Sequence, residues 1–275
     1  MRSFLFVPGD RADRIAKAGT RGADAVIIDL EDAVADAAKP TARAALPASA
    51  ATLRAAGTRV AVRINAPWRP ALADIDAALA AGIDLLIVPK VADAARLCVL
   101  SDMIGQAETL PGATRLIALI ESPAALPHLP AIAAVDRVAG LALGSEDFSL
   151  ELGAPPSARS LDLPCRLIAL AASTRRLMAL GLPVSLTEYR DLTLYEAAAQ
   201  EARAVGMTGA LCIHPAQVPV INRSWRPDAA ALDQARRVLS AWDAAQGQGQ
   251  SVVALDGRMI DLPVVQRARR LLTEE

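Results

Sequence analysis

The chain has 275 residues, of which 53% are hydrophobic and 21% are charged. This composition supplies a large buried core and excludes disorder over most of the length. Lys and Arg total 29 against 30 acids, a formal net charge of -1, so neither nucleic acid nor an anionic membrane is favoured as a partner. Cys98, Cys165 and Cys212 lack C-x-x-C spacing, which argues against a disulfide framework or a thiolate zinc site. Because no apolar run suits a signal peptide or a membrane span, we expect a cytoplasmic protein.

Short aliphatic runs alternate with alanine-rich helical stretches as far as residue 213. The runs cover residues 3–7, 24–29, 59–64, 85–88, 116–120, 138–143, 184–186 and 209–213. They are apolar without strict alternation, which is typical of parallel strands buried on both faces. Between them, helices are expected at 10–19, 41–56, 74–80, 93–104 and 192–205, with N-caps at Asp10, Thr41 and Asp93 and stops at Gly57, Gly82, Gly181 and Gly206.

Eight such strands alternating with helices predict an α/β fold, a (β/α)8 TIM barrel over residues 1–225. A doubly wound open sheet is the alternative, but it favours a G-x-G-x-x-G turn where this chain has Val7-Pro8-Gly9-Asp10. Residues 226–275 exceed the needs of eight βα units. They contain a helical segment at about 228–245, a Gln-Gly linker at 246–250, a strand-like piece at 251–255, an Asp256-Gly257 turn and a basic helix at 263–272. We expect this C-terminal helical extension to act as a lid or an oligomer contact.

Polar residues follow the predicted strands at their C-terminal ends. They are Asp29, Glu31, Asp32, Arg63, Asn65, Lys90, Glu121, Glu146, Asp147, Glu188, Asp191 and His214. Any one of them is readily explained as a solvated loop residue. Seven strand ends in succession instead favour a site, because these ends share the rim where barrel enzymes bind their substrates.

The rim has many carboxylates and few bases, a donor set that suits a hard cation such as Mg²⁺. Glu121 and Asp147 directly follow apolar strands and are the candidate ligands, with salt-bridged loop acids as the alternative. Gly144 before Asp147 allows the backbone to approach a ligand closely. Zinc would favour His and Cys, of which the rim offers only His214 and Cys212.

Three basic residues of the rim each have two interpretations. Arg63 can clamp a carboxylate or stabilise an enolate, or it can form a buried ion pair with Asp29 or Glu31. Lys90 can form a Schiff base, although an ion pair with a neighbouring acid is favoured. His214 can be a general base or a structural hydrogen-bonding group.

The motifs along the chain resemble the citrate lyase beta-subunit-like family of acyl-CoA lyases, in the HpcH/HpaI aldolase superfamily, which includes malyl-CoA and citramalyl-CoA lyases. They are RSFLFVPG from residue 2, DLEDAV from 29, Lys39 and Arg43, VRIN from 62, Pro89-Lys90, Glu121-Ser122, GSED from 144, CIHPAQ from 212 and GRMID from 257. Residues 183–190 are the least typical part, where Leu186-Thr187-Glu188-Tyr189 replaces a more familiar Asp-containing stretch.

The resemblance implies roles for particular residues. Glu121 and Asp147 would hold Mg²⁺, with Arg63 and Glu121 contacting the substrate. Phe6, Arg11 and Lys17 would grip the CoA ester, and Glu146, Ile213 and His214 would line the site, with Asp29, Glu31, Asp32 and Lys90 around it. Asp261 would come from a neighbouring subunit's lid as the acid/base. The resemblance also implies a homotrimer or hexamer, whereas nothing in the sequence indicates citrate lyase partner subunits.

The implied reaction is Mg²⁺-dependent cleavage of a 3-hydroxyacyl-CoA thioester of the malyl-, citramalyl- or citryl-CoA type to a 2-oxo acid and a smaller acyl-CoA. Two alternatives stay open. One keeps the site but makes the chain a malyl-CoA-type thioesterase or synthase, and the other makes it a non-catalytic barrel subunit.

Overall fold

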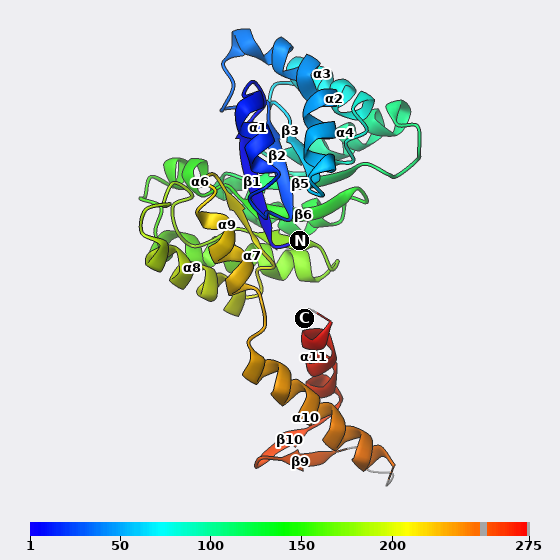
Figure 1. The fold of residues 1–275 in the computed structure, drawn as a ribbon, viewed down its shortest axis with the longest axis vertical. Helices are drawn as coiled ribbons and strands as arrows, with labels where there is room; N and C mark the ends of the chain where they lie inside the picture. The colour runs from blue at the N-terminus through cyan, green and yellow to red at the C-terminus, as the bar shows by residue number, and fades with distance from the viewer. Residues whose placement is uncertain (248–251, 274–275) are drawn as a thin grey trace. The chain divides into compact units, whose positions relative to one another are not determined.

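Eight parallel strands form the core of the protein, as described by a computed structural model of residues 1–247 and 252–273 (Figure 1). The strands are β1 (Ser3–Pro8), β2 (Ala25–Asp29), β3 (Arg59–Arg63), β4 (Leu85–Val88), β5 (Arg115–Ile120), β6 (Val138–Leu143), β7 (Met178–Leu180) and β8 (Ala210–Cys212). They pair in the order β7-β6-β5-β4-β3-β2-β1-β8. A parallel bridge between Leu180 and Gly209 then joins the two ends, so the predicted (β/α)8 barrel is confirmed and is nearly closed.

The barrel strands are connected by helices that pack against the outside of the sheet (Figure 1). These helices are α1 (Ala12–Ala18), α2 (Lys39–Ala55), α3 (Trp68–Ala80), α4 (Ala94–Ala107), α5 (Leu129–Ala133), α6 (Ser145–Leu152), α7 (Ala158–Ser173), α8 (Leu192–Ala204) and α9 (Gln217–Ser224), with 3₁₀ turns η1 (Asp36–Ala38) and η2 (Pro123–His128). No helix among residues 1–247 and 252–273 has the length and apolar character needed to cross a membrane.

The seventh strand was predicted at residues 184–186, which is wrong, because β7 is Met178–Leu180. Gly181, expected to stop a helix, instead follows β7 with φ 141. Its N–H donates to the carbonyl oxygen of Gly209 at 3.0 Å, where a side chain would collide with Leu143. Glu188 and Asp191 therefore lie in the loop after β7 and not at its end, and Asp191 caps α8.

The helix boundaries correct two of the three predicted N-caps. Asp93 caps α4 and accepts a hydrogen bond from the Ala95 N–H at 2.9 Å, as expected. The N-cap position of α1 is Arg11 and not Asp10, and α2 begins at Lys39, before Thr41.

The barrel interior is filled by apolar side chains, nearly all of them aliphatic, that alternate along each strand. This core consists of Phe4, Ala25, Ile27, Ala61, Leu85, Ile87, Ile117, Leu119, Ala142, Leu180 and Leu211. Because side chains two positions apart in a strand share a face, the next inward positions are Phe6 on β1, Asp29 on β2, Arg63 on β3 and Glu121 after β5. The strand pattern therefore brings charged groups together at the C-terminal mouth of a dry core.

A second compact unit, Ser224–Glu275, follows the first unit, Met1–Arg223. It contains α10 (Ala229–Gln246), the antiparallel strands β9 (Val253–Leu255) and β10 (Arg258–Ile260), and α11 (Leu262–Leu272). The predicted turn at Asp256-Gly257 joins the two strands, with φ 51 and 74. This second unit has its own hydrophobic core, formed by Ala235, Val238, Trp242, Ile260, Val265 and Ala268. Most of the predicted linker at 246–250 lies outside the described residues.

Candidate active site

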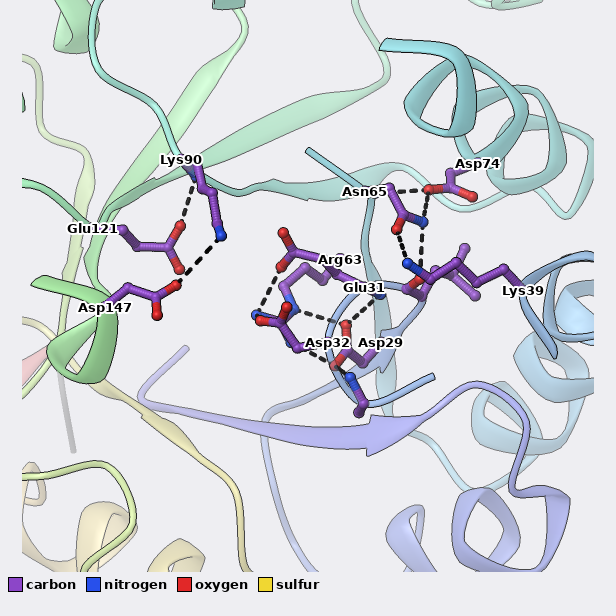
Figure 2. Close-up of polar contacts among 12 residues, drawn as sticks. Asp29, Glu31, Asp32, Lys39, Arg63, Asn65, Asp74, Lys90, Glu121 and Asp147 are labelled. Carbon is purple, nitrogen blue, oxygen red and sulfur yellow. Dashed lines mark hydrogen bonds and ion pairs between the residues drawn. The ribbon is translucent and has the colours of Figure 1, made fainter. Parts of the chain in front are cut away.

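Two carboxylates stand at the ends of the neighbouring strands β5 and β6. Glu121 directly follows β5 and is 8% exposed, and Asp147 lies in the first turn of α6, which follows β6. The Glu121 Oε2 atom accepts a hydrogen bond from the Lys90 N–H at 2.6 Å (Figure 2). Lys90 has φ 53, an unfavourable conformation for a residue with a side chain, and this conformation accompanies the N–H contact with the carboxylate.

The acid pair of Glu121 and Asp147 has one ammonium group, that of Lys90, beside its two carboxylates (Figure 2). The Lys90 Nζ atom lies 3.8 Å from Asp147 Oδ2, which agrees with the ion-pair interpretation of Lys90. Burial raises the pKa of Glu121 above its ordinary value, and the Asp147 charge raises it further, whereas the Lys90 N–H acts in the opposite direction. The ionised pair therefore favours a cation beside it.

Gly144 leaves the space that Glu121 occupies. A Cβ atom on Gly144 would lie 2.5 Å from Glu121 Cγ and 2.9 Å from Glu121 Oε1. Gly144 has φ -91, so its role is to provide space and not a left-handed backbone. The two strand ends can approach each other closely enough for a shared site because this position has no side chain.

Arg63 projects from the end of β3 and is surrounded by acids. Its Nε and Nη2 atoms donate to the two Asp29 oxygens at 2.7 and 2.6 Å. Its Nη1 atom lies 3.0 Å from Glu31 Oε2 and 3.1 Å from Asp32 Oδ2. The guanidinium also lies 5.0 Å from the centre of the Phe6 ring. Burial disfavours its charge, but the three acids more than offset this effect and raise the pKa of Arg63.

Glu31 is a further buried acid of the mouth, at 5% exposure. Burial raises its pKa to about 8, although the Arg63 charge lowers it. Its Oε2 atom is within ion-pair distance of Arg63 but has no hydrogen bond. Figure 2 shows Glu31 and Arg63 on one side of the mouth, facing Glu121, Lys90 and Asp147 on the other.

A buried polar network behind Arg63 was not recognised as a unit from the sequence. The Asp74 carboxylate, 0% exposed, accepts hydrogen bonds from the Asn65 N–H and Nδ2 at 2.7 Å each and from Arg43 Nε at 2.5 Å. Asn65 in turn accepts from Lys39 Nζ at 2.6 Å and donates to the Leu30 carbonyl at 2.8 Å. Asp74 lies on the buried face of α3 with Ala71 and Ala78, and an acid on an apolar face was the available signal.

Other predicted residues surround the mouth with fewer contacts. Phe6 packs on the barrel core, whereas Ile213 is 39% exposed and His214 is exposed. The His214 ring stacks on Tyr189 at 4.7 Å, and its Nδ1 atom accepts from the Ala216 N–H at 3.2 Å. The Glu146 carboxylate accepts a hydrogen bond from the Leu186 N–H at 2.9 Å, so it stabilises the loop after β7.

Three predicted residues take no part in the contacts described above. Arg11 and Lys17 are exposed at the N-cap and in the last turn of α1, and Arg11 pairs with Asp13 at 3.0 Å. Asp261 belongs to the second compact unit, where it caps α11 and accepts from the Val264 N–H at 3.3 Å.

The donor set at the mouth fits Mg²⁺. Among the described residues, no hydrogen-bond donor contacts Glu121 Oε1, Asp147 is half-buried, and the Lys90 ammonium supplies positive charge beside them. Within the described part of the chain, no cluster of three or more His, Cys, Asp or Glu side chains forms a metal cage. Two carboxylates agree with the way Mg²⁺ binds, since it usually keeps several waters and takes substrate oxygens as ligands.

The fold and this mouth define an α/β barrel protein with a carboxylate-rich site at the C-terminal ends of its strands. The family model for HpcH/HpaI aldolase/citrate lyase matches residues 2–215, and the chain belongs to this family.

Similar proteins cover nearly the whole chain. A citrate lyase subunit beta-like protein from Deinococcus radiodurans is 34% identical over 100% of this chain and 97% of its own length. A (3S)-malyl-CoA thioesterase from Cereibacter sphaeroides is 31% identical over 99% of this chain and 94% of its own. The crystal structure of CitE from Mycobacterium tuberculosis in complex with magnesium, acetoacetate and coenzyme A superposes with a TM-score of 0.80 and 32% identity, over 99% of this chain and 97% of that one.

Proposed function

We propose that this chain is a Mg²⁺-dependent lyase that cleaves a carbon–carbon bond in a 3-hydroxyacyl-CoA thioester of the malyl-, citramalyl- or citryl-CoA type. The products are a 2-oxo acid and a smaller acyl-CoA. The observation that carries the proposal is the buried Glu121 carboxylate beside Asp147, with the Arg63 guanidinium facing them across the barrel mouth. The similar CitE structure, described with magnesium, acetoacetate and coenzyme A, supports it.

Glu121 and Asp147 would hold the metal. When bound, Mg²⁺ supplies a Lewis acid and a template for the carboxylate and hydroxyl oxygens of the substrate. The Lys90 N–H, 2.6 Å from Glu121 Oε2, fixes the orientation of the carboxylate that would bind the cation. Lys90 Nζ, 3.8 Å from Asp147, would yield this position to the metal or remain beside it as a second positive charge.

Arg63 would stabilise the negative charge that develops on the substrate. Asp29 and Glu31 are buried, but the Asp32 side chain is 62% exposed, so Asp32 is the partner that the substrate can replace at least cost. The bidentate pair with Asp29 would then keep the guanidinium in a fixed orientation.

The bond changes follow from the substrate. A base takes the proton of the C3 hydroxyl, the oxygen electrons form the new carbonyl of the 2-oxo acid, and the C2–C3 electron pair moves onto the thioester as an enolate. The enolate then takes a proton at C2, and the smaller acyl-CoA leaves. We assign the base to Asp261, delivered by the C-terminal unit of a neighbouring copy in a homotrimer or hexamer.

The CoA part of the substrate would bind at the β1 and β8 side of the mouth. Phe6 offers an apolar surface, and the exposed cations Arg11 and Lys17 suit its phosphates. Ile213 and His214, exposed at the end of β8, would border the same path.

Incubation with malyl-, citramalyl- and citryl-CoA in the presence of Mg²⁺, followed by analysis of all products, tests the proposal. The expected result is equal amounts of a 2-oxo acid and a smaller acyl-CoA. The thioesterase alternative is favoured by the Cereibacter sphaeroides relative, and free CoA without a 2-oxo acid would select it. If the folded protein converts none of the three esters, the remaining hypothesis is that the chain is a non-catalytic barrel subunit.

A further inference from the structure

The segment between β7 and α8 carries a leucine onto the top of the barrel core. Leu186 is half-buried and packs against the interior cluster that also supports Phe6. Its apolar side chain therefore stands above the barrel core, at the mouth that the charged residues surround.

Hydrogen bonds to three side chains, those of Ser145, Glu146 and Gln217, fix the backbone of Leu186. The Leu186 N–H donates to Glu146 Oε1 at 2.9 Å and to Ser145 Oγ at 3.0 Å. On the other side, Gln217, 0% exposed, donates its Nε2 hydrogens to the carbonyls of Leu186 and Glu188 at 2.9 Å each. The Gln217 Oε1 atom accepts from the Ile213 and His214 N–H groups at 2.9 and 3.0 Å, so this amide joins the β7 loop to the end of β8.

These contacts connect Leu186 to the segment that carries Asp147. Ser145 and Glu146, which hold its N–H, directly precede Asp147, and the preceding residue, Gly144, contacts Glu121. The Glu146 carboxyl group lies next to Leu186, because its Oε1 atom accepts from the Leu186 N–H and also from Ser185 Oγ at 2.8 Å.

Arg63 and Lys90, on opposite sides of the mouth, each already have an acidic partner (Figure 2). Arg63 contacts Asp29, Glu31 and Asp32, and Lys90 contacts Asp147. A second carboxylate on the substrate, directed toward Leu186, would lose its hydration against a hydrocarbon side chain flanked by an acid.

We propose that Leu186 is a specificity-determining residue, and that the site takes substrates whose 2-oxo acid product carries a small uncharged alkyl group and not a second carboxylate. This inference rests on the proposed function and narrows it to the citramalyl-CoA type of ester over the citryl-CoA type. Glu146 and Gln217 would act as positioning residues that hold Leu186 in place.

Binding of pyruvate and of freshly prepared oxaloacetate, measured by calorimetry with Mg²⁺ on the full chain, tests the proposal without requiring turnover. We expect pyruvate to bind about tenfold or more tightly than oxaloacetate, the scale on which single side-chain contacts discriminate between ligands. Leu186→Arg should shift the ratio of the two affinities toward oxaloacetate by about tenfold. Leu186→Asn, which serves as the test if the arginine variant does not fold, should shift this ratio in the same direction but by less. Leu170→Arg, at a leucine of α7 that is 65% exposed, is the matched control and should leave the ratio unchanged.

Oxaloacetate binding as tightly as pyruvate, or a ratio that Leu186→Arg and Leu186→Asn leave unchanged, would overturn this assignment. The ratio of kcat/KM for citramalyl-CoA and citryl-CoA gives a second readout. Efficient release of a 2-oxo acid from citryl-CoA in preference to citramalyl-CoA would refute the specificity while supporting the lyase. Selective pyruvate binding without 2-oxo acid release from any ester would support the role of Leu186 and refute the lyase.

Discussion

Substitution of Gly144 by alanine tests whether the space beside Glu121 is required for the site. The added Cβ would lie 2.5 Å from Glu121 Cγ, closer than non-bonded carbon atoms approach, and the backbone φ of -91 is open to alanine. The collision, and not backbone strain, therefore sets the cost. Either the Glu121 side chain moves or the end of β6 moves away from β5.

The expected loss of stability is about 1 to 3 kcal/mol, the usual range for an added methyl group in a packed interior. In a Glu121→Ala background the colliding atoms are absent, so most of this cost should vanish, and a double-mutant cycle should give a coupling of similar size. If Glu121 moves by about 1 Å, turnover should fall by up to about 100-fold.

Urea unfolding of the wild type, both single variants and the double variant measures the coupling, and Mg²⁺-dependent 2-oxo acid release measures the functional loss. Gly105→Ala is the control, since Gly105 lies within α4 and its added Cβ would meet only the Arg137 Nη2 atom at 3.2 Å. It should be neutral or stabilising by up to about 1 kcal/mol. Additive effects of Gly144→Ala and Glu121→Ala would refute the reasoning.

Four further outcomes follow from the contacts of the mouth. Lys90→Gly should stabilise the fold by up to about 1 kcal/mol in thermal unfolding, because φ 53 suits glycine, and a marked loss would show that the ammonium matters more than the backbone. Arg63→Ala should cost about 3–5 kcal/mol in urea unfolding by leaving Asp29 unpaired, and a loss below about 1 kcal/mol would contradict the buried pair. Asp74→Ala should destabilise by a similar amount by leaving Arg43 and Asn65 without their partner, whereas a neutral effect would remove the network from the account. The pKa of Glu31 is raised from 4.5 to about 8 in the folded state, so the folded state binds this proton more tightly than the unfolded state. The free energy of unfolding should therefore fall by up to about 1.4 kcal/mol per pH unit as the pH rises from 4.5 toward 8. Glu31→Gln should flatten this slope in denaturant titrations, and an unchanged slope would exclude Glu31 as its source.

Much of the barrel could be predicted because its strands are short apolar runs that end in charged residues. The alternation that directs Ile27 inward also directs Asp29 inward. The same pattern therefore predicts both the apolar core and the charged residues at the mouth of the barrel. The seventh strand could not be placed this way. Residues 178–180 and 184–186 are both three-residue segments with apolar residues at each end, and the pairing of β7 with β6 distinguishes them.

The site was harder to predict where it depends on contacts between distant segments. Arg63 had two interpretations in the sequence, and the structure shows it bound by three acids from the β2 end, which a single sequence cannot specify. Gln217 ends the CIHPAQ motif, but its four hydrogen bonds to two loops could not be predicted, because they join segments that are distant in the sequence. The assignments of Asp261, Arg11 and Lys17 rest on family resemblance and stay predictions.

The metal dependence of 2-oxo acid formation tests the central claim most directly. Release of the 2-oxo acid from citramalyl-CoA should stop when EDTA removes Mg²⁺, return when Mg²⁺ is added, and require at least tenfold more Mg²⁺ in an Asp147→Asn variant of unchanged stability. A rate that is indifferent to EDTA, or an Asp147→Asn variant with the Mg²⁺ requirement of the wild type, would contradict the assignment of Glu121 and Asp147 as the metal site of a lyase.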